Sequence, residues 1–306
     1  MDITKFELPP SMQKQLDIVR EKRNFDASKW VEQKCKMLNE YMSKSGLKGC
    51  VLNCSGGIDS SVTLALIKHA SKMENSPIKR IIAIAQPIHS TASIQNKAYI
   101  ISKHLDVEIF TIDQTEIFDK LENLCRTSTK LETSKFATGQ LKSYMRTPVV
   151  YYVCQMLSSC GIPSIVMGTG NFDEDGYILY YCKAGDGVAD VSLISDLHKR
   201  EVYLVGHYLK LPEEILGAVP SADLWSGQTD EDELGFSYKF IELFTEYLIM
   251  SEEEQRKMRE AMTENDLKQF DKWAEMAQKV HRCNLHKRNF PKTFPIYAYM
   301  DKILTI

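Results

Sequence analysis

The sequence predicts an α/β fold, a doubly wound parallel sheet of five strands with helices flanking both faces. Short apolar runs, typical of buried strands, alternate with segments whose apolar residues recur at helical spacing. A glycine turn, Ser55-Gly56-Gly57, stands between the first of these runs and the helix that follows. Strands joined through helices run parallel and are buried on both faces. A chain of 306 residues is long enough for such a core.

The predicted elements follow one another in this alternating order. An N-terminal helical region over residues 11–45 ends at Gly46 and Gly49. The predicted strands are residues 50–54, 81–86, 107–112, 162–169 and 188–194. The predicted helices start at Ile58 and cover residues 91–105, 134–160 and 197–209. Pro148 predicts a kink or a restart in the long helix. The tail beyond residue 235 predicts helices and a polar end, so we expect a helical extension over 1–46 and one domain over 47–306.

Composition narrows the class of protein. Apolar residues make up 43% of the chain, charged residues 26%, and the net charge is −3, which disfavours a general nucleic-acid binder held by phosphate contacts. The N-terminus does not resemble a signal peptide, and no apolar stretch approaches the length of a membrane span. The eight cysteines include no Cys-x-x-Cys pair. We therefore expect reduced thiols in a cytoplasmic protein without nucleic-acid or membrane partners.

Polar residues follow several of the predicted strands. Ser55, Gln86, Asp113 and Thr169 each stand at or just after the end of an apolar run. Ligands in parallel α/β sheets bind beyond the carboxyl ends of the strands. These four residues are therefore expected to cluster around one binding site.

The segment Ser55-Gly56-Gly57-Ile58-Asp59-Ser60 has the features of a phosphate-binding loop. Its glycines allow close approach of the backbone to an anion, and the helix that follows directs its N-terminal amides and dipole to the same place. It is not a Walker A loop, because it lacks the Gly-Lys-Ser/Thr ending. It carries Asp59 instead, and a carboxylate beside phosphates suits a Mg²⁺ ion that neutralises both. The alternative is a glycine-rich strand-to-helix turn without a ligand.

This loop resembles that of the PP-loop ATP pyrophosphatases, a superfamily that cleaves ATP between the α- and β-phosphates. In that chemistry a substrate oxygen attacks the α-phosphorus, pyrophosphate leaves, and a nitrogen or sulfur nucleophile then displaces AMP. The superfamily includes GMP synthetase, asparagine synthetase, tRNA-modifying enzymes and NAD synthetase. The loop alone does not distinguish between these members.

Further motifs resemble one member, the ammonia-dependent NAD synthetase family. Gly168-Thr169 with Glu174, and Lys183-Ala184-Gly185-Asp186-Gly187 with Asp190, are similar to its Gly-Thr-…-Glu and Lys-x-Gly-Asp-Gly-x-x-Asp patterns. The later landmarks that match in the family's order are Leu197–Arg200, Pro220–Leu224, Thr229–Gly235 with Tyr238, and His286–Arg288. Together they cover residues 47–295. The resemblance implies a Rossmann-like, adenine nucleotide alpha hydrolase-like fold.

The resemblance also implies roles for individual residues. Asp59 and Glu174 would hold Mg²⁺, and Asp59, Asp186 and Lys199 would be the catalytic residues. The residues implied to bind ATP are Asn53, Cys54, Ser55, Gly56, Gly57, Ile58, Asp59, Ser60, Gln86, Arg146, Thr169, Lys199 and Ser221. Those implied to bind deamido-NAD are Tyr144, Lys183, Asp186, Asp190, His286 and Lys287. Taken singly, Glu174 could be a solvated loop acid, Lys199 an exposed helix residue and His286 a structural histidine.

One segment departs from the family pattern. The family usually has Asn-x-Lys-Ala-Arg-x-Arg in the long helix, and residues 140–146 here read Gln-Leu-Lys-Ser-Tyr-Met-Arg. Tyr144 thus replaces the first arginine, which family members use on the dinucleotide, while Arg146 is kept. Residues 170–173 also differ from the commoner forms. Of the roles that the resemblance implies, binding of the substrate's phosphates and ribose therefore depends most on these positions.

The implied activity is amidation of deamido-NAD with ammonia and ATP through an adenylated intermediate, which releases AMP and pyrophosphate and completes NAD biosynthesis. Two alternatives stay open: another PP-loop amidotransferase or tRNA-modifying enzyme, and a module that binds nucleotide without turnover. The 46 residues before the first motif leave no room for an amidase domain, so ammonia is the expected nitrogen donor. The family resemblance implies a homodimer.

Overall fold

The computed structural model describes residues 6–90, 92–218 and 229–288 and contains the predicted parallel sheet. The five strands lie in the order β3-β2-β1-β4-β5, and all pairs are parallel. Their bounds are β1 (Gly49–Asn53), β2 (Arg80–Ala85), β3 (Glu108–Thr111), β4 (Ser164–Gly168) and β5 (Val191–Ser192). The order reverses between β1 and β4, which confirms a doubly wound α/β fold and places a crevice beyond these strands.

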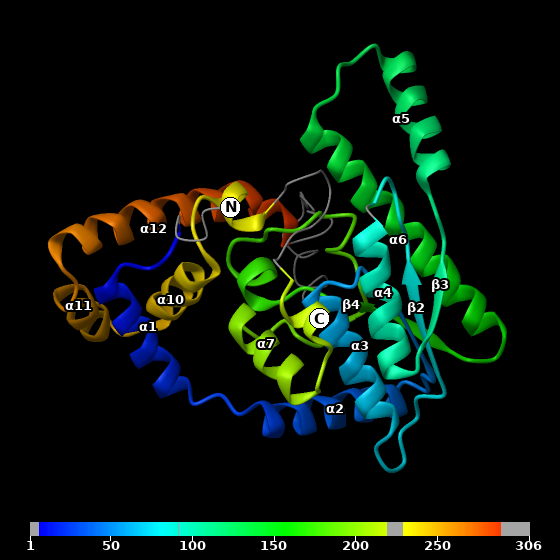
Figure 1. Ribbon diagram of the computed structural model, residues 1–306, viewed down its shortest axis with the longest axis horizontal. Helices are drawn as coiled ribbons and strands as arrows, with labels where there is room; N and C mark the ends of the chain where they lie inside the picture. Colours follow the sequence, from blue (N-terminus) through cyan, green and yellow to red (C-terminus); the bar gives the residue numbers. More distant parts are fainter. Residues whose placement is uncertain (1–5, 91, 219–228, 289–306) are drawn as a thin grey trace, which may run out of the picture.

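Helices cover both faces of the sheet (Figure 1). One face packs on α2 (Ala27–Lys44), α3 (Ile58–Ser71), α4 (Ala92–Leu105), α7 (Lys199–Tyr208) and α8 (Glu213–Leu216), and the other packs on α6 (Lys135–Ser159). Successive residues of β1 serve different faces: Cys50 and Leu52 belong to the first core, and Val51 packs with Val150 and Cys154 of α6. Strands that are buried on both faces in this way read as near-continuous apolar runs in the sequence.

The N-terminal region is helical as predicted and consists of two helices. α1 (Pro10–Arg23) ends at Asn24, whose φ of 44° breaks the helical path. Asp26 then caps α2 by accepting a hydrogen bond from the backbone N–H of Lys29 at 3.0 Å. The break lets the two helices pack on different parts of the molecule.

A second hydrophobic core forms away from the sheet. α1 packs there with α10 (Tyr238–Ile249), α11 (Glu252–Glu260) and α12 (Glu264–Asn284), at the left of Figure 1. Phe240 lies at its centre, in ring contact with Phe244, Phe270 and Trp273. The N-terminal helix is therefore held by the C-terminal helices, far from it in sequence.

Three local features differ from the sequence-based expectations. α5 (Thr115–Thr129) was not predicted. A kink or a restart was predicted at Pro148; α6 runs unbroken through it, so the helix does not restart there, and the kink stays a prediction. Buried residues on both sides of the proline hold the helix against its neighbours despite the lost hydrogen bond. β5 has two residues, although 188–194 was predicted as a strand. The remaining short elements are η1 (Phe172–Gly176), α9 (Asp230–Leu234) and η2 (Leu285–Lys287). None of the helices described could cross a membrane.

Candidate active site

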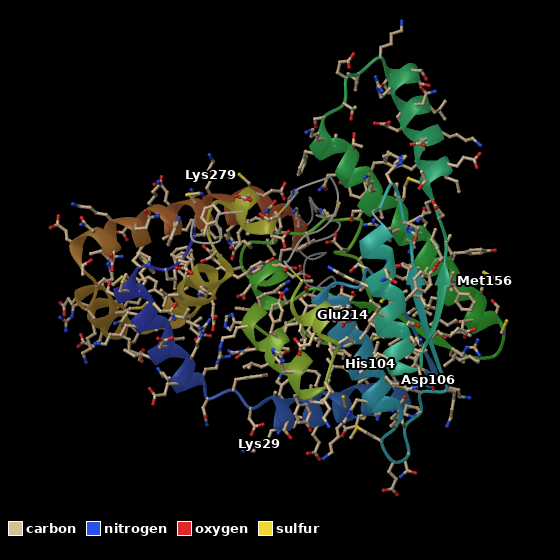
Figure 2. The ribbon with its side chains drawn as sticks, in the orientation of Figure 1. Lys29, His104, Asp106, Met156, Glu214 and Lys279 are labelled. Atoms are coloured by element: carbon tan, nitrogen blue, oxygen red, sulfur yellow. The ribbon has the colours of Figure 1, made fainter. Side chains whose placement is uncertain are left out.

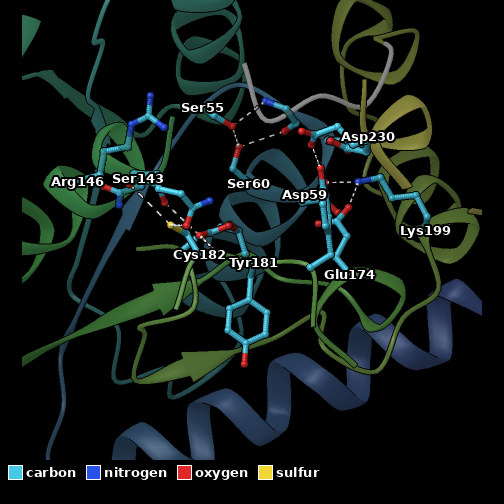
Figure 3. Close-up of a pocket in the computed structure, with 18 of the residues that line it drawn as sticks. Ser55, Asp59, Ser60, Ser143, Arg146, Glu174, Tyr181, Cys182, Lys199 and Asp230 are labelled. Carbon is cyan, nitrogen blue, oxygen red and sulfur yellow. Dashed lines mark hydrogen bonds and ion pairs between the residues drawn. The ribbon is translucent and has the colours of Figure 1, made fainter. Parts of the chain in front are cut away.

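A cavity of about 790 Å³ lies beyond the carboxyl ends of β1, β2 and β4 (Figure 3). The loop after β1, the segment after β2, η1, the start of α7 and part of α12 contribute to its walls. Most residues predicted from the sequence to bind ligand line it: Asn53, Cys54, Ser55, Gly57, Ile58, Asp59, Ser60, Gln86, Arg146, Thr169, Glu174, Asp186, Lys199 and Lys287. A large cavity at a topological switch point is the expected ligand site of such a fold.

The loop between β1 and α3 presents hydrogen-bond donors to this cavity. The backbone N–H of Gly57 donates to Ser55 Oγ at 3.2 Å, and the hydroxyl groups of Ser55 and Ser60 lie 3.1 Å apart. Gly57 caps α3 without a side-chain hydrogen bond, so the first amides of this helix remain available for an anion. The loop therefore has the arrangement of a phosphate cradle.

Gly56 has a different role from the other loop residues. Its φ is 80°, and a Cβ atom there would lie 2.6 Å from the backbone nitrogen of Ala98 in α4. Gly56 is not among the cavity-lining residues. It is needed for the turn and for the close approach of α4, because a side chain would be both strained and crowded.

Lys199 lies between two carboxylates at the floor of the cavity. Its Nζ is 2.7 Å from Asp59 Oδ2 and 2.8 Å from Glu174 Oε1, and all three side chains are largely buried. Burial opposes the charge on Lys199, but the two ion pairs outweigh it and raise the pKa of this ammonium. Burial also raises the pKa of Asp59, whereas the ion pair with Lys199 helps to hold the pKa of Glu174 below its ordinary value despite burial. Three residues distant in sequence thus form one charged centre.

Asn171 and Tyr238 hold the two carboxylates, and the sequence did not single out either as a site residue. Asn171 is fully buried; its Nδ2 donates to Asp59 Oδ1 at 2.9 Å, and its Oδ1 accepts from the backbone N–H of Glu174 at 3.1 Å. The Tyr238 hydroxyl lies 2.7 Å from Glu174 Oε1 and 2.8 Å from Asp230 Oδ2. Burial, and then the charge of Glu174, raise the pKa of Asp230 to about 6.

The donor chemistry of this centre fits Mg²⁺. Asp59 and Glu174 supply carboxylate oxygens, the ligands that Mg²⁺ prefers, and they already flank one cationic group. Within the described ranges, no three His, Cys, Asp or Glu side chains form a complete metal site. Two protein carboxylates, with water and phosphate completing the shell, are typical of magnesium in nucleotide enzymes.

The opposite end of the cavity carries Asp186 and Lys287. Asp186 Oδ1 accepts hydrogen bonds from the Ser143 hydroxyl at 3.1 Å and the backbone N–H of Cys182 at 2.9 Å, and burial raises its pKa. Lys287 Nζ donates to the carbonyl oxygen of Leu179 at 2.9 Å, and burial lowers its pKa. An exposed acid and a half-buried amine thus both line the cavity.

Several predicted residues lie elsewhere. Tyr144, Lys183, Asp190 and His286 are not among the cavity-lining residues. Asp190 Oδ2 instead accepts from the backbone N–H of Val166 at 2.7 Å and so holds β4. The Lys183 ammonium donates to the carbonyl oxygen of His286 at 2.6 Å. Their predicted contacts with deamido-NAD stay predictions.

Asp113 and Ser221 were also predicted to lie at the site. Asp113 does not line the cavity, so its predicted place in the cluster of strand ends is wrong. It follows the edge strand β3, and its Oδ1 accepts from the backbone N–H of Thr115 at 2.8 Å at the start of α5. Ser221, predicted to bind ATP, lies outside the described residues.

Comparisons with known proteins show the family of this chain. The model of the NAD synthase family matches residues 30–291. An NH(3)-dependent NAD(+) synthetase from Carboxydothermus hydrogenoformans is 34% identical over 73% of this chain and 87% of that protein. One of the same name from Sulfurisphaera tokodaii is 30% identical over 91% of this chain and 92% of its own.

Among solved structures, the NMN synthetase of Francisella tularensis superposes with a TM-score of 0.73 at 27% identity, covering 89% of this chain and all of that one. Both the family model and the relatives match this chain over most of its length, and the relatives are themselves matched nearly end to end. The chain belongs to the NAD synthase family of ligases.

Proposed function

We propose that this chain amidates deamido-NAD with ammonia and ATP, the final step of NAD biosynthesis. The observation that carries the proposal is the charged centre of Lys199, Asp59 and Glu174 beside a phosphate cradle in one cavity. The family match and the NH(3)-dependent relatives support it. A parallel sheet with helix N-termini at the ligand edge is suited to nucleotide phosphates.

The reaction begins with attack of the nicotinate carboxylate on the α-phosphorus of ATP. The amides at the start of α3, with the hydroxyl groups of Ser55 and Ser60, receive the leaving pyrophosphate. Lys199 balances the negative charge that develops on the phosphates. Ammonia then attacks the adenylated carbonyl carbon, and AMP leaves. This sequence forms the amide without a side-chain nucleophile.

Asp186 is proposed as the group that accepts a proton from ammonium. Asp186 is exposed to the cavity, and desolvation there raises the pKa of its carboxyl, which brings it closer to the working pH of a general base. Ser143 and the backbone of Cys182 fix its orientation. A positioned acid–base group in a partly dry site is what the second step requires.

Asp59 and Glu174 are proposed to hold Mg²⁺ when ATP is bound. The ion would neutralise phosphate charge and stabilise the departing pyrophosphate. Lys199, which pairs with both carboxylates here, is then free to contact the nucleotide phosphates with its ammonium. Each charge of the centre would thus keep a partner of opposite charge when nucleotide binds: the carboxylates pair with Mg²⁺, and Lys199 pairs with the phosphates.

A homodimer is proposed from the outer surfaces of α5 and α6. Exposed large apolar side chains occur along both helices: Ile117 is 60% exposed, Leu124 60% and Tyr152 68%. Figure 2 shows Met156 of α6 pointing outward from the body. An apolar surface of this kind is typical of a protein interface.

The eight free cysteines, five of them buried, support a reducing compartment, the cytoplasm.

Nicotinate mononucleotide is a second candidate substrate. The same chemistry applied to it yields NMN, and the Francisella tularensis protein is named an NMN synthetase. The favouring observation is Tyr144, which stands where the family's dinucleotide-binding arginine is expected and does not line the cavity. Loss of that contact would weaken selection for the second nucleotide of the substrate.

Pyrophosphate release from Mg-ATP tests these proposals. Deamido-NAD, nicotinate mononucleotide and xanthosine monophosphate are compared as acceptors, with ammonium present and with a reaction lacking any acceptor. We expect release that depends on deamido-NAD and is matched by NAD formation. A higher kcat/KM with the mononucleotide would favour the second candidate. Release with neither nicotinate substrate would contradict both.

A further inference from the structure

A network of buried charges runs behind the cavity wall that carries Lys199. Its centre is His198, the residue before Lys199, whose side chain is completely buried. His198 Nδ1 lies 2.7 Å from Asp173 Oδ1, and Nε2 lies 3.2 Å from Glu246 Oε1. Burial opposes a charge on this ring, but the bonds to the two carboxylates raise the pKa of His198 to about 10. The imidazolium therefore donates to both acids at neutral pH.

Asp173 connects this network to the reacting groups. Its Oδ2 accepts from the backbone N–H of Lys199 at 2.7 Å, at the first turn of α7. Glu174 is the next residue, and the backbone N–H groups of Asp173 and Glu174 both donate to Asn171 Oδ1. A displacement of the Asp173 carboxylate would move both Glu174 and the start of α7. It would thereby change the distance from Lys199 to its partners.

Arg23 closes the network from α1. Its Nε and Nη2 donate to the two oxygens of Glu201 on α7, at 2.5 and 2.8 Å. Glu201 Oε2 also accepts from the backbone N–H of His198 at 3.1 Å. Arg23 Nη2 donates in addition to the carbonyl oxygen of Asp196 at 3.0 Å, just before α7. Arg23 thus binds α1 to the segment that positions Lys199.

We propose that Arg23 and His198 are positioning residues for Lys199 and Glu174, so that α1 is a working part of the active site although it lies outside it. The proposal rests on the function assigned to Lys199 and Glu174 above. Arg23 lies on α1, before residue 30, where the family match begins. A misplacement of about 1 Å at the reacting groups, caused by a distant mutation, can reduce the rate about 100-fold.

Arg20 provides a matched control for Arg23. It lies one turn earlier on α1 and also forms a two-pronged ion pair with a buried acid, Glu242, with Nε at 2.9 Å from Oε1. Glu242 belongs to α10, so this pair joins α1 to α10. Arg20→Met and Arg23→Met should both lower thermal stability, because each leaves a buried carboxylate unpaired.

Two substitutions separate the functions of the two nitrogens of His198. Asparagine places its amide nitrogen near the position of Nδ1 and can keep the bond to Asp173. Glutamine places its amide nitrogen near the position of Nε2 and can keep the bond to Glu246. The proposal expects His198→Asn to retain the site and His198→Gln to disturb it.

The measurements are the Tm, kcat and KM for ATP, and calorimetric binding of α,β-methylene-ATP to the full chain. We expect Arg23→Met and His198→Gln to lose about tenfold or more in kcat/KM and in analogue affinity. Arg20→Met and His198→Asn should stay within about threefold of the original protein. The proposal would be overturned if Arg23→Met had the same kinetic constants and affinity as Arg20→Met, and His198→Gln the same as His198→Asn. Because analogue binding needs no turnover, it tests the positioning even if the original protein makes no NAD.

Discussion

The charged centre of the cavity holds one ammonium between two carboxylates. Lys199 pairs with Asp59 and Glu174, so the three buried groups carry a net charge of about −1 when all are ionised. A polyphosphate added to this centre requires further positive charge. The proposed Mg²⁺ supplies it, and the two carboxylates are the groups in the cavity best placed to hold the ion.

Replacing either carboxylate by its amide should stop turnover without unfolding the chain. Asp59→Asn and Glu174→Gln keep shape but remove the charge that binds the ion, so we expect kcat/KM to fall by roughly 100-fold or more. Steady-state assays at several Mg²⁺ concentrations, with circular dichroism for the fold, measure this. Asp113→Asn is the control, since Asp113 follows the strand β3 but does not line the cavity. Near-normal activity of either amide variant would remove that residue from the metal site.

Lys199→Met should impair the use of ATP far more than binding of deamido-NAD. Loss of a charge-assisted contact costs about 2–3 kcal/mol, or roughly 30- to 150-fold in kcat/KM for ATP. The variant should also be less stable, because Asp59 and Glu174 lose their shared cation. Initial rates against each substrate separate the effects. Arg200→Met, at an exposed neighbouring position, is the control. Unchanged kinetics for ATP would show that Lys199 does not act on the phosphates.

Residue identities could be predicted where a local motif carries them. Ser55, residues 57–60, Glu174 and Lys199 were all identified from the sequence, and the structure brings them into one cavity. Asn171, Asp173 and Tyr238 were missed as site residues, although each holds a reacting group. Their function depends on contacts between segments up to 112 residues apart, which no local pattern records.

At the scale of elements, the alternation of strands and helices predicted the sheet. The edge elements and the break within the N-terminal helical region were harder to predict from the sequence. Asp26 is a recognisable helix cap, and its presence would have divided the N-terminal helix at the observed place. α5 buries one residue, Phe118, so it contributes little to the core pattern that predicts helices. The Asp190 side chain, just before the short β5, bonds the backbone of Val166 in the middle of β4, a contact that periodicity cannot reveal.

The α6 helix carries the main departure from its family. Tyr144 is 39% exposed and its hydroxyl donates to Gln140 Oε1 at 3.3 Å, within the same helix. Tyr144→Arg restores the commoner residue at a position with room for it. We expect normal folding and tighter binding of deamido-NAD by a few-fold, measured by calorimetry. Nicotinate mononucleotide is the control ligand, and its affinity should not change. A folded variant that no longer binds deamido-NAD would show that this helix is wrongly matched to the family.

At the scale of the whole molecule, the cavity joins two cores. The phosphate loop and Lys199 come from the sheet and its helices, whereas Met276, Lys279 and Val280 of α12 come from the second core. The ion pair of Arg23 with Glu201 ties α1 to α7 across this division, whereas the pair of Arg20 with Glu242 joins two helices of the second core. The relative placement of the two cores therefore shapes the site, a property that depends on long-range packing and not on any single motif.

The nitrogen source and the products together test the account most directly. The purified chain is supplied with deamido-NAD, Mg-ATP and ¹⁵N-ammonium, and separately with glutamine in ammonia-free buffer. We predict NAD whose amide carries ¹⁵N, one AMP and one pyrophosphate per NAD, and no synthesis from glutamine alone. Release of ADP and phosphate, an unlabelled amide, or comparable synthesis from glutamine by a preparation free of glutaminase would contradict it.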